Sequence, residues 1–212
     1  MKKKILQIRP NGLFLHLQMT KAERTKKYIV EKAADLINRK GIAGTSLSDI
    51  MEATQLAKGG VYGNFESKDA ICREAFNYLA EKQYNSIKQK LDEQPTAKLK
   101  LFALLEYYNL RVIANSGGCH MLNFGTEADD TNPAIKQQVK KAMQKIESTI
   151  AGLVTLGINN KEFKKNFDAT LFAAKAFSMI EGAVFVSRIQ NNNRHLLIIT
   201  EALKKEIKEN VL

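Results

Sequence analysis

Several residue types on which particular fold and function classes depend are scarce in this sequence. Its 212 residues include no tryptophan, 3 prolines and 2 cysteines. So little proline, together with 44% hydrophobic and 26% charged residues, excludes a collagen-like or disordered chain and is typical of a helix-rich globular protein. The two cysteines, Cys72 and Cys119, can form neither a disulfide framework nor a four-ligand zinc site. If both stay free, the chain belongs in a reducing compartment, and we expect the cytoplasm.

The patterns of enzyme and cofactor sites are missing as well. The three histidines, His16, His120 and His195, do not have the spacing of metal ligands. The sequence contains neither a glycine-rich phosphate loop nor a Gly-Xaa-Ser-Xaa-Gly nucleophile elbow. We therefore expect a non-enzymatic protein that has no cofactor and no metal.

The N-terminal end lacks the uninterrupted apolar run of a secretion signal. After the lysines at positions 2–4, Arg9 and Pro10 interrupt the apolar stretch before the roughly seven residues that a signal peptide needs. A far more regular pattern begins at Met19. Residues 1–18 are therefore interpreted as an N-terminal extension, and a natural start at Met1 and one at Met19 both stay open.

Hydrophobic residues recur at three- and four-residue steps over most of the chain, and no stretch alternates as a half-buried strand does. Gly41 is a typical helix stop, and Ser46 followed three residues later by Asp49 is a variant of the capping box. These signals predict an all-α fold in three parts: the extension, a three-helix domain over residues 19–66, and a linking helix with a C-terminal helical domain over residues 67–212. About nine helices are expected, at about 20–40, 46–53, 57–62, 68–91, 96–115, 119–128, 133–157, 168–190 and 193–210.

The charge is distributed unevenly along the chain. The formal net charge is +11, and residues 1–65 contain 12 basic and 5 acidic residues, against 21 and 17 in residues 66–212. A basic N-terminal third favours a polyanionic partner.

Two short predicted helices in this basic third are joined by a three-residue turn and braced by the preceding helix. This is the geometry of a helix-turn-helix, whose second helix enters the major groove of DNA. Gly59 and Gly60 each cost about 1 kcal/mol in a helix, which indicates that the backbone approaches a phosphate or a groove wall closely. Lys58 and Tyr62 are predicted to lie at or near base edges. The apolar seam between the two helices consists of Leu47, Ile50, Met51, Leu56, Val61 and Phe65.

Two helix starts in the same stretch can bind DNA phosphates. The hydroxyl of Thr45 or Ser46 lies beside the free amides that open the second helix, and Lys68 opens the fourth. Asn64, which we expect to face outward, can contact a base or a phosphate. The predicted DNA-binding residues are therefore Thr45, Ser46, Lys58, Gly59, Gly60, Tyr62, Gly63, Asn64 and Lys68.

The same stretch resembles the DNA-binding domain of the TetR (tetracycline-repressor) family of bacterial transcription regulators over about residues 21–75. The sequence departs from the family pattern at residues 53–56, which read Ala-Thr-Gln-Leu where the family usually has Ala-Gly-Val, and at Gly63, where many members have a larger residue. The motif that carries the resemblance is Thr45, Asp49-Ile50, Lys58-Gly59, Tyr62, Phe65 and Ser67-Lys68-Asp69.

The resemblance implies a homodimeric repressor that binds a palindromic operator in double-stranded DNA and is released by a small-molecule effector. The two recognition helices must then reach successive major grooves about 34–36 Å apart. A ligand in the C-terminal domain can change this separation through the helix that begins at Lys68, and a coupling of about 1–3 kcal/mol per site is sufficient.

The segment at residues 168–189 is apolar nearly all round, with 14 apolar residues of 22. Such a helix calls for burial on more than one side, and Lys175 and Glu181 argue against a membrane span. We therefore expect it to pack on its own core and against a second subunit. The predicted dimer interface consists of Ala169, Ala173, Ala176, Ala183, Leu196, Ile199 and Leu203.

Aromatic and apolar residues of the C-terminal part are candidates for an effector pocket, although each also fits an ordinary core. They favour an uncharged or mixed aromatic and apolar small molecule. Cys119, at a probable helix start, has two interpretations: a thiolate that senses electrophiles or oxidants, or a small buried residue. The candidate ligand-binding residues are Phe102, Tyr107, Tyr108, Cys119, His120, Met121, Phe124, Phe172, Phe177 and Met179.

A second function class is compatible with the composition. A non-enzymatic helical adaptor could use its basic N-terminal pole on an acidic protein or an anionic surface. Sequence-specific affinity for a palindrome at physiological salt distinguishes a regulator from an adaptor, whose attraction to DNA would be weak and steeply salt-dependent.

Overall fold

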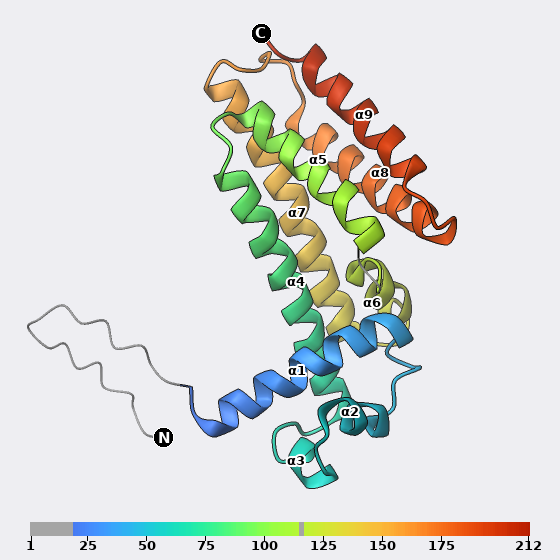
Figure 1. The fold of residues 1–212 in the computed structure, drawn as a ribbon. Helices are drawn as coiled ribbons and strands as arrows, with labels where there is room; N and C mark the ends of the chain where they lie inside the picture. Colours follow the sequence, from blue (N-terminus) through green and yellow to red (C-terminus); the bar gives the residue numbers. More distant parts are fainter. Residues whose placement is uncertain (1–18, 115–116) are drawn as a thin grey trace, which may run out of the picture.

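A computed structural model of the chain describes residues 19–114 and 117–212, and these residues form nine α-helices without a β-strand (Figure 1). The predicted extension at residues 1–18 and the predicted helix end at residue 115 lie outside the described residues. The helices are α1 (Lys21–Lys40), α2 (Leu47–Thr54), α3 (Lys58–Tyr62), α4 (Lys68–Asp92), α5 (Ala97–Ala114), α6 (His120–Ala128), α7 (Pro133–Asn159), α8 (Ala169–Ile189) and α9 (Arg194–Glu209).

Local capping determines where several of these helices begin, and it confirms the all-α prediction. Thr20 forms a capping box with Glu23 at the start of α1, and Ser46 forms one with Asp49 at the start of α2. The Ser67 hydroxyl accepts a hydrogen bond from the third residue of α4, Ala70, at 3.1 Å. Most predicted boundaries agree with the observed ones within two residues, because these signals are read from neighbouring residues.

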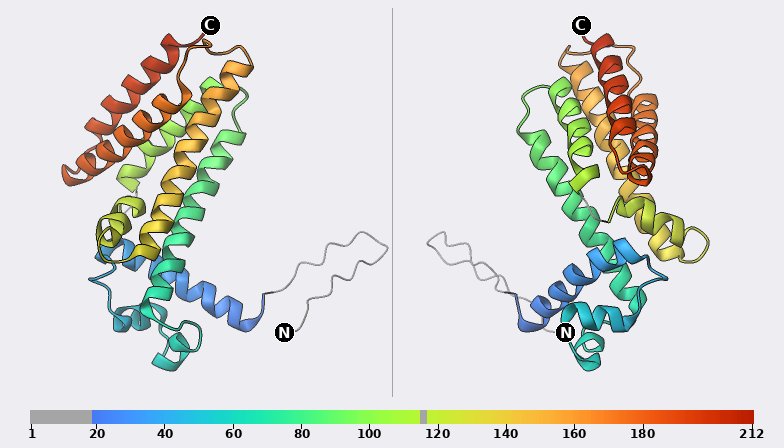
Figure 2. Two further views of the ribbon diagram at one scale, coloured as in Figure 1. Left: turned by 180° about the vertical axis from the view of Figure 1, so that it is seen from behind. Right: turned by 45° about the vertical axis from the view of Figure 1, so that its right-hand side comes forward.

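The molecule is elongated, with α1–α3 at one end and the C-terminal helices at the other (Figures 1 and 2). The long helices α4 and α7 pack side by side along its length. The first part of α4 belongs to the three-helix end, since it packs on α1, and its remainder packs on α5 and α7. Helix α4 therefore joins the two ends, as the sequence predicted.

Helix α6 lies between the two ends and contacts α1, α4 and α7. Two rings of α6 pack on the ring of Phe76 in α4. The ring centroid of Phe124 lies 5.4 Å from that of Phe76, and the ring centroid of His120 lies 5.6 Å from it. The hydrophobic core is thus continuous from α1 through α4 and α6 to the C-terminal helices.

Helix α8 is the one described helix that is long and apolar enough to cross a membrane by length and composition. It packs against α5, α7 and α9, and a core helix of this kind passes the same test. One such helix is weak evidence for a membrane span, and Glu181 is buried in its middle.

Candidate nucleic-acid interface

The two short helices are locked together by the predicted apolar seam. Ile50 of α2, Val61 of α3 and Phe65 are buried, and Leu47, Met51 and Leu56 pack against them half-buried. Gln55 ends α2 in the left-handed conformation, with a φ of 56°, which turns the chain into α3. The Tyr28 hydroxyl of α1 donates to the carbonyl of Thr54 at 3.2 Å and attaches the end of α2 to α1. The helix-turn-helix prediction is confirmed.

The outer side of α3 presents Lys58 and Tyr62 to solvent. Tyr62 is 47% exposed, and the Lys58 ammonium lies 5.8 Å from the centroid of its ring. A large exposed aromatic residue beside a cation is a surface suited to base edges and phosphates. Both residues are exposed, and their contact with base edges stays a prediction.

Gly59 lies on the open side of this helix. A Cβ atom there would meet no other atom within 4 Å, whereas one at Gly60 would lie 3.5 Å from the Leu56 side chain. The backbone conformation at Gly59 does not require glycine, so its missing side chain leaves a bare stretch of helix backbone beside Lys58 and Tyr62. Only Gly59 leaves the backbone open in this way, and a close approach of DNA there stays a prediction.

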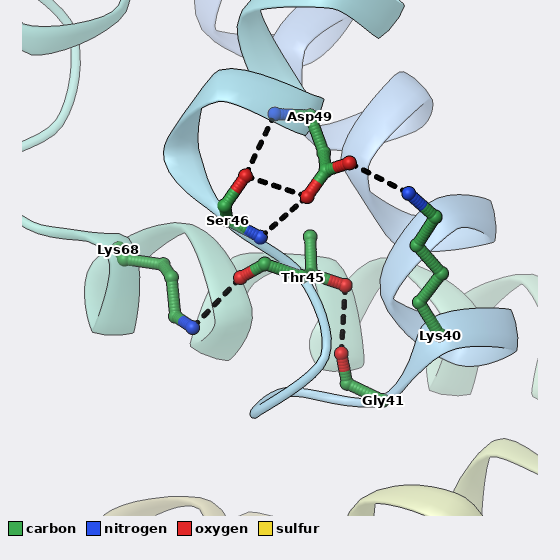
Figure 3. Close-up of polar contacts among 6 residues, drawn as sticks. All are labelled: Lys40, Gly41, Thr45, Ser46, Asp49 and Lys68. Atoms are coloured by element: carbon green, nitrogen blue, oxygen red, sulfur yellow. Dashed lines mark hydrogen bonds and ion pairs between the residues drawn. The ribbon is translucent and has the colours of Figure 1, made fainter.

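Two predicted DNA contacts, Thr45 and Lys68, are directed into the protein (Figure 3), and the amide of a third, Asn64, which we expected to face outward, binds a nearby backbone carbonyl. Thr45 is fully buried, and its hydroxyl donates to the Gly41 carbonyl at 2.7 Å. The Lys68 ammonium donates to the carbonyls of Ile42 at 2.7 Å and Thr45 at 2.8 Å. The half-buried Asn64 amide donates to the Gly60 carbonyl at 2.8 Å. Thr45 and Lys68 thus hold the loop between α1 and α2, whose carbonyls lack helical partners, and Asn64 caps a carbonyl of α3.

The start of α2 is held by a charged network around Asp49 (Figure 3). Its carboxylate accepts from the Lys40 ammonium at 2.6 Å and from the Ser46 hydroxyl and amide at 2.6 and 2.7 Å. These donors hold the pKa of Asp49 well below its usual range, with the Lys40 hydrogen bond as the largest cause. Ser46 is exposed at the interface, but its hydroxyl serves the cap. Lys40 carries no sequence signal for this role.

The candidate effector residues lie in or against the hydrophobic core, and three of them line two described clefts. Phe102 and Tyr107 line a cleft of about 380 Å³ between α4, α5 and α9, whereas Cys119 lines one of about 400 Å³ between α1, α6 and α8. Tyr107 and Tyr108 pack edge to face at 5.6 Å, and Phe172 packs on Phe167. The remaining candidates are buried or half-buried side chains of the core and its edge: His120, Met121, Phe124, Phe177 and Met179. That these ten residues bind an effector stays a prediction.

Cys119 is the N-cap of α6, as its sequence position suggested, but its thiol is not activated. Burial and, after it, the neighbouring carboxyl of Glu181 raise the pKa of Cys119 well above its usual value. Glu181 is 6% exposed, and its own pKa is raised by burial, while a hydrogen bond from the Cys119 thiol opposes that shift. Desolvation thus outweighs the helix-start amides, and the packing interpretation of Cys119 fits better. Burial likewise raises the pKa of Cys72 to about 11, and this side chain is part of the hydrophobic core.

Five of the seven predicted dimer residues on α8 and α9 point into their own chain, so the interface prediction is wrong for these five. Ala173, Ala176, Ala183, Leu196 and Leu203 are all at most 5% exposed, and Ala169 and Ile199 are half-buried against the core. The outer side of the two helices carries other apolar residues, which we call the outer apolar face. It consists of Leu171, Phe185 and Ile189 on α8 and Leu197 and Ile198 on α9, which are 41–69% exposed.

Comparison with known proteins agrees with this architecture at both ends of the chain. A family model described as bacterial regulatory proteins of the tetR family matches residues 29–75, and one described as the tetracyclin repressor-like C-terminal domain matches residues 97–203.

Two solved structures, both of TetR-family transcriptional regulators, resemble the chain over almost its full length. The protein from Cytophaga hutchinsonii is 33% identical, with 92% of this chain and 98% of that chain covered and a TM-score of 0.87. The protein from Chloroflexus aurantiacus J-10-FL is 35% identical, with 91% and 98% covered and a TM-score of 0.86. A further relative, the HTH-type transcriptional repressor DhaR of Mycobacterium sp. strain GP1, is 20% identical over 183 residues, which are 84% of this chain and 91% of that protein.

Proposed function

Since this chain belongs to the TetR family of bacterial regulatory proteins, we propose that it is a homodimeric transcriptional repressor that binds a palindromic operator and is released by a small-molecule effector. The observation that carries the DNA-binding role is the exposed pair of Lys58 and Tyr62 on α3, which the buried Val61 and Phe65 anchor to the domain. We place the protein in the cytoplasm, where its DNA target lies, and assign it no catalytic activity.

Dimerisation supplies the second recognition helix that binding to a palindrome requires. The outer apolar face supports a contact between α8 and α9 of two copies, because five large apolar side chains there are exposed on a single chain. Helices α8 and α9 do not contact α3, so a contact between them leaves both recognition helices free to bind DNA (Figure 1).

Binding to DNA selected by the protein itself tests the proposal. Fragments are selected from the region upstream of its gene, and fluorescence anisotropy compares the selected fragment with random DNA at physiological salt. Tyr62→Ala should weaken the specific complex by about 1–3 kcal/mol and leave random DNA nearly unaffected. Tyr84→Ala is the matched control, because it removes an aromatic ring about 24 Å along α4 from Lys68.

A different pattern would contradict the proposal. If the wild-type protein binds every fragment weakly, with a steep loss as salt rises, the basic end attracts polyanions without reading sequence, as the adaptor alternative requires. If Tyr62→Ala loses equal affinity for selected and random DNA, Tyr62 does not contact base edges.

A further inference from the structure

The loop between α1 and α2 is held by a side chain of α6, far from it in the sequence. The Glu127 carboxylate accepts hydrogen bonds from the backbone amides of Ile42 at 2.9 Å and Ala43 at 2.8 Å, one on each oxygen. The Ile42 carbonyl accepts from the Lys68 ammonium of α4 at 2.7 Å. Both polar groups of Ile42 are therefore bound by side chains of helices that lie outside α1–α3.

The loop is shaped around this carboxylate. Gly41 has a φ of 84°, and a Cβ atom there would lie 2.4 Å from Oε1 of Glu127. Glycine is thus needed at position 41 for the backbone conformation and for the approach of the carboxylate. Consecutive amides directed at one carboxylate form a specific anion-binding concavity.

A second residue of α6 holds the preceding helix. The Asn123 amide donates to the carbonyl of Asn38 in α1 at 2.8 Å and to the carbonyl of Gly117 at 2.6 Å. Asn123 and Glu127 are four residues apart, so they lie on one face of α6. This face binds the end of α1 and the start of the loop together.

We propose that Glu127 is a positioning residue for operator recognition, which sets the loop that leads into α2 and thereby aims α3. The inference rests on the proposed DNA-binding function and adds a route between the two ends of the molecule. Helix α2 begins at Leu47, four residues after Ala43, and α3 follows it through a short turn. A shift of α6 therefore reaches the reading helix through the backbone of residues 42–46 as well as through α4.

The carboxylate is required because it offers two acceptor oxygens in one rigid group. A glutamine has a single acceptor oxygen, and its NH₂ group would face the second backbone amide. Glu127→Gln should consequently release one amide, and Glu127→Ala should release both.

Two measurements on the full chain test the proposal. Hydrogen exchange followed by NMR should show faster exchange, by about tenfold or more, of both the Ile42 and Ala43 amides in Glu127→Ala and of one of the two in Glu127→Gln, with the amides of α7 unchanged. Affinity for the DNA fragment selected by the wild-type protein should fall by about 10- to 100-fold in Glu127→Ala and by less in Glu127→Gln, while random DNA is bound as by the control. Glu81→Gln is the control, because it makes the same charge change at an exposed position of α4.

Each outcome decides the matter. Released amides with selected-DNA affinity equal to that of the control would overturn the proposal, because the loop would then not aim α3. Unchanged exchange at Ile42 and Ala43 would overturn it too, since the contact would not exist in solution. A parallel loss on selected and random DNA indicates general destabilisation and also counts against it. The exchange measurement needs no DNA, and failure of the wild-type protein to discriminate between fragments concerns the proposed function alone.

Discussion

Lys68 tests most directly whether the structure or the sequence-based prediction assigns the role of a side chain correctly. The sequence suggested that its ammonium binds a DNA phosphate, whereas the structure directs it at the carbonyls of Ile42 and Thr45. The two interpretations predict different results for Lys68→Met, which removes the charge and keeps most of the aliphatic stem.

The size of the effect follows from the two hydrogen bonds. Each hydrogen bond to a charged group contributes about 1.5–3 kcal/mol, so two contribute at most about 6 kcal/mol. Lys68 is half-buried, and water can replace part of the interaction, so we expect a loss of about 2–3 kcal/mol in the free energy of unfolding. For a chain of this size that loss lowers Tm by roughly 4–12 °C.

Thermal unfolding by circular dichroism measures the shift, and Lys90→Met is the matched control on the exposed side of α4. A phosphate contact would instead leave Tm unchanged and reduce the salt dependence of DNA binding, by a slope of about 0.9 for each phosphate released. An unaltered Tm together with a shallower salt slope in Lys68→Met would refute the structural interpretation.

Two further predictions concern the C-terminal domain. Phe185→Glu places a charge on the outer apolar face, so it should be a monomer in sedimentation and should bind the operator weakly in anisotropy measurements. Leu110→Glu, the control at a similarly exposed apolar residue of α5, should stay dimeric. A dimeric Phe185→Glu would exclude this face as the interface. Glu181→Gln should be more stable than the wild type at neutral pH in urea unfolding. Burial raises the pKa of Glu181 in the folded state. The contribution of protonated Glu181 to the free energy of unfolding is therefore fully present below the ordinary pKa of 4.5, and it is lost as the pH rises through the folded-state pKa. The difference between the two proteins should therefore shrink on acidification towards pH 4.5, and a pH-independent difference would contradict the assignment.

The helices and the apolar seam between α2 and α3 could be predicted from the sequence because they depend on neighbouring residues. Ser46 and Asp49 form their capping box within one turn, and Val61 and Phe65 meet α2 across a short connection. Lys58 and Tyr62 remain exposed because Val61, which lies between them, takes the buried side of α3. Local pattern therefore sufficed for the fold class and for the centre of the candidate interface.

The orientation of α8 was beyond sequence reasoning for a physical reason. A helix that is apolar nearly all round has no polar face to indicate which side meets solvent. By composition, Ala173 and Phe185 are equally suited to an interface, and only the packing of α8 on α5, α7 and α9 buries the first and exposes the second.

From the sequence alone came the all-helical fold, the helix-turn-helix and the exposed pair on α3, since hydrophobic periodicity and capping act over a few residues. Only the tertiary structure decided that Lys68 and Glu127 hold the loop before α2. The Ile42 amide and the Glu127 carboxylate are 85 residues apart, and such a contact exists only when α1, α4 and α6 are packed together. Buried backbone groups without helical partners must find donors and acceptors elsewhere, and the packing of the whole chain determines which side chains supply them.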